Sequence, residues 1–384
     1  MTAPLRDIKV LDFSTLLPGP MATLFLAEAG AEVIKVERPG RGEEMRSYLP
    51  KWGADSANFN LLNRGKKSIA VDLKDPEQLA LLRPLVETAD VIVEQFRPGV
   101  MQRLGLGYQD VVAINPDIIF CSITGYGQDG PKSKKAGHDL NYIGDSGMLG
   151  LSCGTVETPV IPPALIADIA GGTYPAVLNI LLALRERDKT GAPSHIDISM
   201  SDNLFPFLYW AMGEGQVSDK WPGNGDALVT GGSCRYRLYA TADGKFVAAA
   251  PIETKFWLAF TKAIRLPEAL CDDSLDMTAT TRAIEQIISE KPAAEWEPIF
   301  DRADCCCTIV KTVNEAMQDT HFQSRGVFSK RISNDQGAEL TALPTPISQQ
   351  FTNQASAASA PVLGADNDLL GEDKGPELTE EELR

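Results

Sequence analysis

Short apolar segments rich in β-branched residues recur along the first 200 residues, and longer stretches of mixed polarity separate them. The stretch at 21–30 follows the turn Pro18–Pro20 and has the composition of a helix closed by Gly30. A strand, a helix and a second strand within about 30 residues predict a parallel βαβ unit, and its repetition predicts an open α/β sheet covered by helices. Six segments have the length and composition of buried strands: 8–13, 31–37, 68–73, 90–96, 117–127 and 194–200.

Two helices carry clear end signals. Asp75 followed by Pro76 supplies an N-cap and a first-turn proline, and together they predict a helix over 75–89. A long apolar helix is predicted to begin at Thr173 and to end, after several basic residues, at Gly191.

The pattern changes after residue 225. Two apolar segments flank Asp243 and Gly244, which is typical of a β-hairpin, and three amphipathic helices follow it. We therefore predict a Rossmann-like open parallel sheet in a large α/β domain and a smaller α+β domain. The predicted bounds are 1–225 for the large domain, 226–330 for the small domain and 331–384 for a C-terminal segment that returns to the large domain.

Composition narrows the classes of function. The net charge of −16 argues against a nucleic-acid partner. No uninterrupted apolar run reaches the roughly 20 residues that span a bilayer, and the N-terminus lacks the pattern of a secretory signal, so no membrane partner is expected. The spacing of the seven cysteines fits no metal site, and Cys305–Cys307 are interpreted as buried thiols beside a strand. We expect a protein of the reducing cytoplasm.

The first βαβ turn and the basic residues after later strands indicate what the sheet binds. The turn "STLLPGPMATL" lacks the G-x-G-x-x-G fingerprint, which argues against a dinucleotide cofactor. Arg38 and Arg97 follow strands, at the edge of the sheet where α/β proteins bind ligands, and Arg64 lies in a basic segment just before a strand. They indicate a phosphate-rich ligand, and the alternative is ordinary charge on solvated loops.

Three further segments carry residues suited to chemistry. His138 lies in the glycine-bounded segment "AGHDLNYIG", and histidine titrates closer to neutral pH than other side chains. Asp168 lies in "LIADIAGGTYPAV", where a helix N-terminus favours a carboxylate and the pair Gly171–Gly172 lets a ligand approach the backbone. Glu253 lies in "PIETKFW" at the start of a helix. Each has a structural alternative: a loop position for His138 and its neighbour Asp139, an N-cap for Asp168, and a first-turn acid for Glu253.

These segments, in their order along nearly the whole chain, resemble the family III CoA transferases (CaiB/BaiF type), and within that superfamily the α-methylacyl-CoA racemases. The motifs that carry the resemblance are "VLDFSTLLPGPMATLFLAEAGAEVIKVERPG", "NRGKKSIAVDLK", "FRPGVMQRLGLG", "GHDLNY", "ADIAGG" and "TGAPSHIDISM". The series as a whole is specific for the superfamily. One departure lies in the last motif, where His195 replaces a residue that is usually not aromatic.

The resemblance implies catalytic roles for three residues. The racemases pair the histidine of "GHDxNY" with the aspartate of "ADIAGG", and a glutamate of the small domain supports the histidine; here these are His138, Asp168 and Glu253. The resemblance also implies a homodimer with interlocked subunits and an acyl-CoA substrate, with no separate cofactor and no metal. The CoA part of that substrate is assigned to five residues: Arg38, Arg64, Arg97, Asp139 and Tyr142.

Three functions remain open at this point. The first is epimerisation at C2 of 2-methyl-branched acyl-CoA thioesters, with His138 and Asp168 exchanging protons with opposite faces of the α-carbon through an enolate. The second is transfer of CoA between carboxylic acids, with Asp168 as the nucleophile that forms an anhydride and then a CoA thioester. The third is a non-catalytic acyl-CoA binder, and the presence of His138, Asp168 and Glu253 argues against it.

Overall fold

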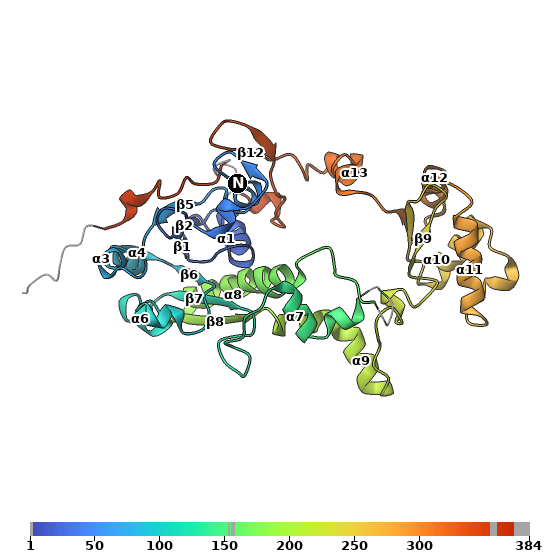
Figure 1. Cartoon of the computed structure of the whole chain (residues 1–384), viewed down its shortest axis with the longest axis horizontal. Coiled ribbons are helices and arrows are strands. Elements are labelled where there is room, and N and C mark those ends of the chain that lie inside the picture. The colour runs from blue at the N-terminus through green and yellow to red at the C-terminus, as the bar shows by residue number, and fades with distance from the viewer. Residues whose placement is uncertain (1–2, 153, 155–157, 354–358, 372–384) are drawn as a thin grey trace, which may run out of the picture. The chain divides into compact units, whose positions relative to one another are not determined.

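The largest sheet has six parallel strands in the structure, a computed structural model that describes residues 3–152, 154, 158–353 and 359–371. Every pair of neighbouring strands in this sheet is parallel (Figure 1). This confirms the predicted α/β class. In their spatial order the strands are β5 (Lys67–Ala70), β2 (Glu32–Glu37), β1 (Lys9–Asp12), β6 (Val91–Glu94), β7 (Ile119–Thr124) and β8 (Ser194–Ser199).

The chain order of these strands reverses between β1 and β6. From β1 the chain moves outward through β2 to β5, returns to β6 on the other side of β1, and continues through β7 to β8. This is the doubly wound order of the Rossmann fold, in which the loops after the two central strands diverge and leave a crevice.

Contacts divide the chain into two compact units. The first unit holds residues 1–143, 164–205 and 325–384, and the second holds 144–163 and 206–324. The boundary that we predicted at residue 226 therefore falls inside the second unit, which also takes in a segment from before the long helix.

Helices of the first unit pack on the sheet through apolar side chains. Leu85 of α4 (Arg83–Thr88) and Val111 of α6 (Tyr108–Ile114) share one core with Leu11 and Ile92 of the central strands. Helices α1 (Pro18–Glu28) and α8 (Tyr174–Thr190) contact each other and the sheet. The remaining short elements of this unit are β3 (Lys51–Trp52), β4 (Asp55–Ser56), α2 (Ala57–Asn63), α3 (Pro76–Ala80), α5 (Val100–Arg103), α7 (Asp139–Asp145), which ends two residues beyond the unit, β12 (Arg331–Ser333) and β13 (Glu339–Thr341).

Prolines explain two differences from the predicted helices. The turn Pro18–Pro20 was expected to precede the first helix, but α1 begins at Pro18, because proline suits the first turn, where no N–H partner is needed. The single helix predicted over 75–89 is two helices, α3 and α4, and Pro84 lies at the start of the second. Proline lacks the N–H that would continue the helix. The predicted N-cap is confirmed, since Asp75 accepts a hydrogen bond from the Glu77 N–H.

The long helix near residue 173 begins earlier than predicted. A π-helical segment, Ala167–Thr173, leads directly into α8, which ends as predicted at Gly191 with a left-handed φ of 68°. Among the described residues, the combined run Ala167–Thr190 is the one helix long and apolar enough to cross a membrane by length and composition. A helix packed inside a protein core meets the same two criteria, so this is weak evidence for a membrane span.

The second unit is built around an antiparallel sheet. Its strands are β11 (Cys307–Ile309), β10 (Phe246–Ala249) and β9 (Arg237–Ala240), and the predicted hairpin at Asp243 is confirmed by the antiparallel pairing of the last two. Trp257 and Trp296 are buried in its core. Its helices are α9 (Tyr209–Ser218), α10 (Thr254–Ile264), α11 (Met277–Ile288), α12 (Ala293–Ala303), α13 (Val313–Met317) and α14 (Thr320–Ser324).

Two further predictions concern the cysteines and the C-terminal segment. Cys305 is buried as expected, but Cys306 is exposed, so the three thiols do not share one environment. Within the C-terminal segment, residues 359–371 lie along the edge strand β5, where Asp366 accepts a hydrogen bond from the Ser68 N–H at 2.8 Å. Covering an edge strand in this way satisfies backbone groups that the sheet leaves unpaired.

Candidate active site

A pocket of about 450 Å³ opens at the carboxyl end of the parallel sheet, at the point where the strand order reverses. Segments at the carboxyl ends of four strands line it: residues 15, 16 and 18 after β1, 95–98 after β6, 123–125 at the end of β7, and Met200 after β8. This is the position where open α/β sheets bind their ligands. The remaining wall comes from residues 133–142 and from Asp168, so the pocket brings together His138 and Asp168, which are 30 positions apart in the chain.

His138 is held at the start of a short helix. The segment that showed no clear pattern in the sequence forms α7, and the His138 carbonyl accepts the N–H of Asn141 at 2.8 Å. The His138 N–H donates in turn to the Asn141 side chain at 3.0 Å. Backbone contacts therefore fix the residue while its imidazole stays exposed beside the pocket, available to a ligand.

Asp139 connects the two catalytic candidates. Its buried carboxylate accepts the Asp168 N–H at 3.0 Å, which ties α7 to the π-helical segment that carries Asp168. Burial raises the pKa of Asp139, and backbone N–H groups of 166–168 oppose that rise. Asp139 thus serves as the cap of the π-helical segment, a role that positions the site rather than one that binds CoA directly.

Asp168 is not itself an N-cap, contrary to the structural alternative considered from the sequence. It lies one residue inside the π-helical segment, whose N-cap is Ile166. Burial, and after it the negative charge of Asp139, raises the pKa of Asp168 to about 7. A carboxyl group with this pKa exists in both protonation states near neutral pH, as a proton donor and acceptor requires.

The glycine pair after Asp168 packs against protein rather than ligand. A Cβ atom at Gly171 would collide with the Met200 carbonyl oxygen, and one at Gly172 would press on Met200 and Pro18. The sequence-based interpretation of this pair as a point of ligand approach was therefore wrong. Glycine here lets the π-helical segment lie close to the ends of β8 and α1, which brings Asp168 to the pocket.

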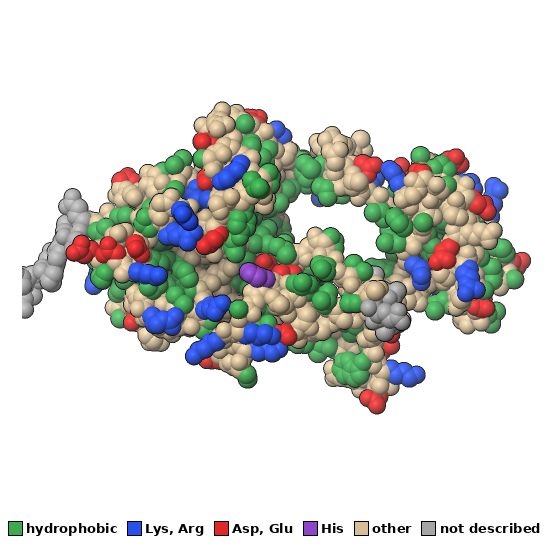
Figure 2. All heavy atoms as spheres, in the orientation of Figure 1, with side chains coloured by type: hydrophobic (Ala, Val, Ile, Leu, Met, Phe, Trp, Pro, Cys, Tyr) green, Lys and Arg blue, Asp and Glu red, His purple; other side chains and the backbone are tan. Residues whose placement is uncertain are grey.

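Tyr142 and Arg97 both line the pocket, as the sequence led us to expect of ligand-binding residues. The Tyr142 hydroxyl donates to the Gly137 carbonyl, and burial, followed by the charge of Asp168, raises the pKa of Tyr142 to about 12. The Arg97 side chain is exposed and lies three residues beyond the end of β6. In the view of Figure 2, several Lys and Arg side chains lie on the visible face of the first unit, with Asp and Glu side chains between them.

The structure separates the other two arginines from this pocket. Arg38 lines a different cavity of about 550 Å³, where its guanidinium lies 3.3 Å from Glu44. Arg64 is buried, with 1% of its surface exposed, and its three nitrogens donate to Glu28 and to the carbonyls of Leu61 and Leu343. The assignment of Arg64 to CoA is therefore corrected: the side chain is buried with each of its nitrogens bonded to protein, and the residue joins α1 to the C-terminal region.

Glu253 belongs to the second unit and is not among the residues that line the pocket. It is the N-cap of α10, where its carbonyl accepts the N–H groups of Phe256 and Trp257, and its side chain makes no capping bond. The Glu253 carboxylate therefore makes no hydrogen bond to the first turn of α10.

Two polar residues of the pocket were missed in the sequence. The Thr124 hydroxyl is buried at the end of β7 and has no hydrogen-bond partner among the described residues. The Gln95 side-chain oxygen Oε1 accepts the Gly19 N–H at 3.1 Å, which joins the loop after β6 to the first turn of α1. Both lie near the carboxyl ends of the predicted strands 90–96 and 117–127, and that position at the edge of the sheet was the signal that could have identified them.

The sequence model of the family described as CoA-transferase family III matches residues 5–367. The chain belongs to this family. The membership confirms the resemblance drawn from the motifs, and it makes the protein an enzyme of a family that acts on acyl-CoA substrates.

The relatives of this chain include both racemases and CoA-transferases. The alpha-methylacyl-CoA racemase of Homo sapiens is 33% identical over 377 residues, which cover 97% of this chain and 93% of the relative. The succinyl-CoA:glutarate CoA-transferase of Homo sapiens is 38% identical over 312 residues, 78% of this chain and 69% of the relative. The crystal structure of a CaiB/BaiF family protein from Brucella suis matches with a TM-score of 0.80 at 27% identity, over 96% of this chain and 98% of that one.

Proposed function

We propose that the protein epimerises C2 of 2-methyl-branched acyl-CoA thioesters, with His138 and Asp168 as the two proton-transfer groups. The observation that carries this proposal is the placement of both side chains on one pocket, together with the raised pKa of Asp168, about 7. Inversion of a carbon centre needs one protonated and one unprotonated group, one on each face of the α-carbon. An imidazole beside a carboxyl group that titrates near neutrality supplies such a pair.

The developing enolate needs hydrogen-bond donors. The backbone N–H groups near Asp168 are one candidate, but the Asp168 N–H itself already donates to Asp139. At the start of α7 the Asn141 N–H already donates to the His138 carbonyl, so the N–H groups of Asp139 and Leu140 precede the first helical hydrogen bond. We assign the enolate oxygen to them, because donors fixed in advance stabilise charge that develops in the transition state.

The second candidate is CoA transfer between carboxylic acids, favoured by the 38% identity to the human succinyl-CoA:glutarate CoA-transferase. In that reaction ionised Asp168 attacks the thioester carbonyl, and His138 has no required part. An assay that supplies one acyl-CoA epimer with and without a free carboxylic acid separates the two. Formation of the other epimer without added acid supports the epimerase, whereas CoA on the added acid without epimerisation supports the transferase.

The pH dependence of kcat/KM provides a further test. Epimerisation needs exactly one proton on the His138–Asp168 pair, so the profile should be bell-shaped, with one limb near pH 7 from Asp168. Both directions should share this profile, because their ratio is fixed by an equilibrium constant that does not depend on pH. A transferase needs only ionised Asp168, so its activity should rise through pH 7 and then remain level. Initial rates from pH 5 to 9, measured from each epimer, distinguish these shapes.

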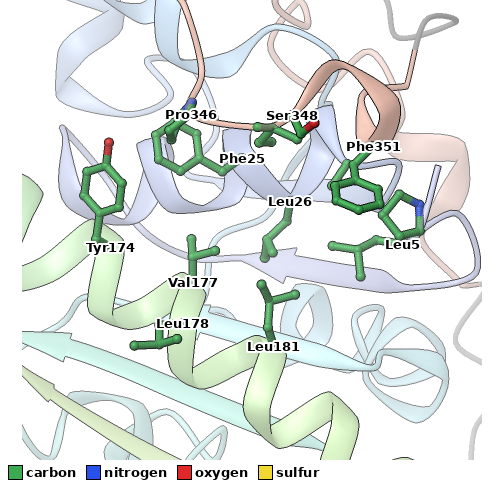
Figure 3. A pocket seen from close by; sticks show the side chains of 13 residues that line it. Leu5, Phe25, Leu26, Tyr174, Val177, Leu178, Leu181, Pro346, Ser348 and Phe351 are labelled. Atoms are coloured by element: carbon green, nitrogen blue, oxygen red, sulfur yellow. The ribbon is translucent and has the colours of Figure 1, made fainter.

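We also propose that the protein is the homodimer implied by the resemblance. An apolar cavity of about 630 Å³ lies on the first unit between α1, α8 and residues 346–351 (Figure 3). Leucines of α8 on this face are exposed, with 59% of Leu178 accessible. Apolar surface of this kind is rare on monomers and typical of subunit interfaces.

The oligomeric state is tested by placing a charge on that face. Leu178→Asp should shift the protein from dimer to monomer in size-exclusion chromatography with light scattering, because a buried carboxylate opposes association. Leu275→Asp, at a leucine that is 77% exposed and does not line the cavity, is the matched control. A Leu178→Asp variant that remains dimeric would exclude this face from the interface.

A further inference from the structure

Three polar side chains on adjacent strands form a hydrogen-bonded row beside the active-site pocket. Glu94 ends β6, Ser122 lies on β7 and His195 lies on β8. The Ser122 hydroxyl bonds to the Glu94 carboxyl group and lies 3.3 Å from His195 Nε2. Glu94 and Ser122 are buried, with 4% and 2% of their surfaces exposed. Burying a carboxyl group costs free energy unless hydrogen bonds or an opposite charge compensate for the loss of water.

Aromatic contacts hold the histidine at the end of this row. The His195 ring stacks on Tyr108, with centroids 4.8 Å apart, and meets the edge of Phe120. Beside it lies a cavity of about 20 Å³, the size of one water molecule, which is lined by Glu94, Ser122, His195 and Gln128. The Gln128 Nε2 atom is buried and has no partner among the described residues.

The row is connected to the pocket through the backbone after β6. Glu94 Oε2 accepts the Phe96 N–H at 2.8 Å, and the residues that follow, 95–98, line the active-site pocket. Arg97 lines both the pocket and the small cavity. A change in the charge or position of Glu94 therefore changes the hydrogen bond to the Phe96 N–H, and with it the turn that carries Arg97 into the pocket.

We propose that Glu94, Ser122 and His195 form a positioning relay that holds the 95–98 turn in its CoA-binding conformation, so that the protonation of Glu94 tunes CoA affinity. The proposal rests on the proposed acyl-CoA site and extends it to three residues that touch neither the thioester nor the catalytic pair. None of the three lines the active-site pocket.

The direction of the effect follows from the hydrogen bonds. Ionised Glu94 accepts from both the Phe96 N–H and the Ser122 hydroxyl, and we assign the ring proton of His195 to Nε2, so that Ser122 accepts from it. Protonated Glu94 donates to Ser122 instead, and the bond from Phe96 loses its charge assistance and about half its strength. CoA affinity contributed by the turn is thus present when Glu94 is ionised and is lost as the pH falls through its pKa.

The surroundings place this transition near neutral pH. Burial raises the pKa of Glu94 to about 7, with a smaller contribution from the charge of Asp197 on β8, while the bonds from Ser122 and Phe96 oppose the rise. Burial lowers the pKa of His195, which keeps its ring neutral in the same range. The other titratable groups beside Glu94 are Cys121 of β7, whose thiol is buried, Tyr108 of α6 and Arg97.

Isothermal titration of the full-length protein with CoA itself, at pH 6 and pH 8, tests the relay. We expect Glu94→Gln to bind CoA about tenfold more weakly than the wild type at pH 8 and equally at pH 6, because the amide keeps the shape but not the charge. Protonation of the CoA phosphates affects both proteins alike and cancels in the comparison. Ser122→Ala and His195→Phe should also weaken binding at pH 8, and in turnover these variants should raise KM while kcat is retained.

Ser68→Ala is the matched control, because Ser68 is an equally buried strand serine that bonds to Glu37 instead. Wild-type affinity in Glu94→Gln and Ser122→Ala at both pH values would overturn the relay, as would an equal loss in Ser68→Ala. A wild-type protein that binds CoA but neither epimerises nor transfers would contradict the proposed function alone. A wild-type protein that does not bind CoA would contradict both.

Discussion

Asp168→Asn should lower the rate of epimerisation by about 10³- to 10⁴-fold, to the level that binding alone provides. The amide has nearly the shape of the carboxyl group, so the contacts of the π-helical segment and the Asp168 N–H bond to Asp139 persist. What it loses is the ability to exchange a proton. Because Asp168 is the nucleophile in the alternative reaction, CoA transfer should fall as well. Initial rates with a single acyl-CoA epimer, and separately with an added carboxylic acid, measure both losses.

Asp129→Asn is the control for this substitution, since Asp129 is an exposed loop carboxylate outside the pocket. Its activity should equal that of the wild type. If Asp168→Asn retained full activity, neither the epimerase nor the transferase mechanism could stand. Equal melting temperatures for the two variants would show that the loss is chemical.

His138→Ala should reduce epimerisation by about 10²- to 10⁴-fold, the usual contribution of a positioned general acid or base. The backbone bonds between His138 and Asn141 do not involve the imidazole, so α7 should form in the variant. The same substitution should affect a transferase much less, because ionised Asp168 attacks without it. The ratio of the two activities in this variant therefore identifies the reaction.

His321→Ala provides the comparison, because His321 is an exposed histidine on α14 of the second unit. We expect the His321→Ala variant to epimerise at the wild-type rate. An epimerase whose rate is unchanged by His138→Ala would need a different second proton-transfer group, and the assignment of the pair would then be wrong.

Much of the sheet was predictable because its signals are local. The apolar segment at 8–13 became β1, and Gly191 ended the long helix because glycine tolerates the left-handed conformation found there. Proline positions were harder, since the same residue begins α1 at Pro18 and separates α3 from α4 at Pro84. Sequence alone shows that a proline limits a helix but does not show on which side.

The site residues could be predicted where a motif carries the residue type that the chemistry needs. They could not be predicted where the role of a side chain depends on hydrogen-bond partners far away in the chain. His138, Asp168, Arg97 and Tyr142 were assigned from their motifs, and the structure places all four on one pocket. The sequence around Arg64 looks like that of a ligand-binding arginine. Its hydrogen-bond partners, Glu28 and the Leu343 carbonyl, lie far away in the chain, so only the fold shows that the guanidinium is already bonded to protein.

The most direct test of the central claim is proton exchange at C2. The purified protein is incubated with (S)-2-methylacyl-CoA in D₂O and followed by proton NMR, with Asp168→Asn as the inactive reference. The account predicts loss of the C2 proton signal through deuterium incorporation, together with appearance of the R epimer. Retention of the C2 proton, with CoA transferred once a free carboxylic acid is added, would contradict it and would make Asp168 the nucleophile of a transferase.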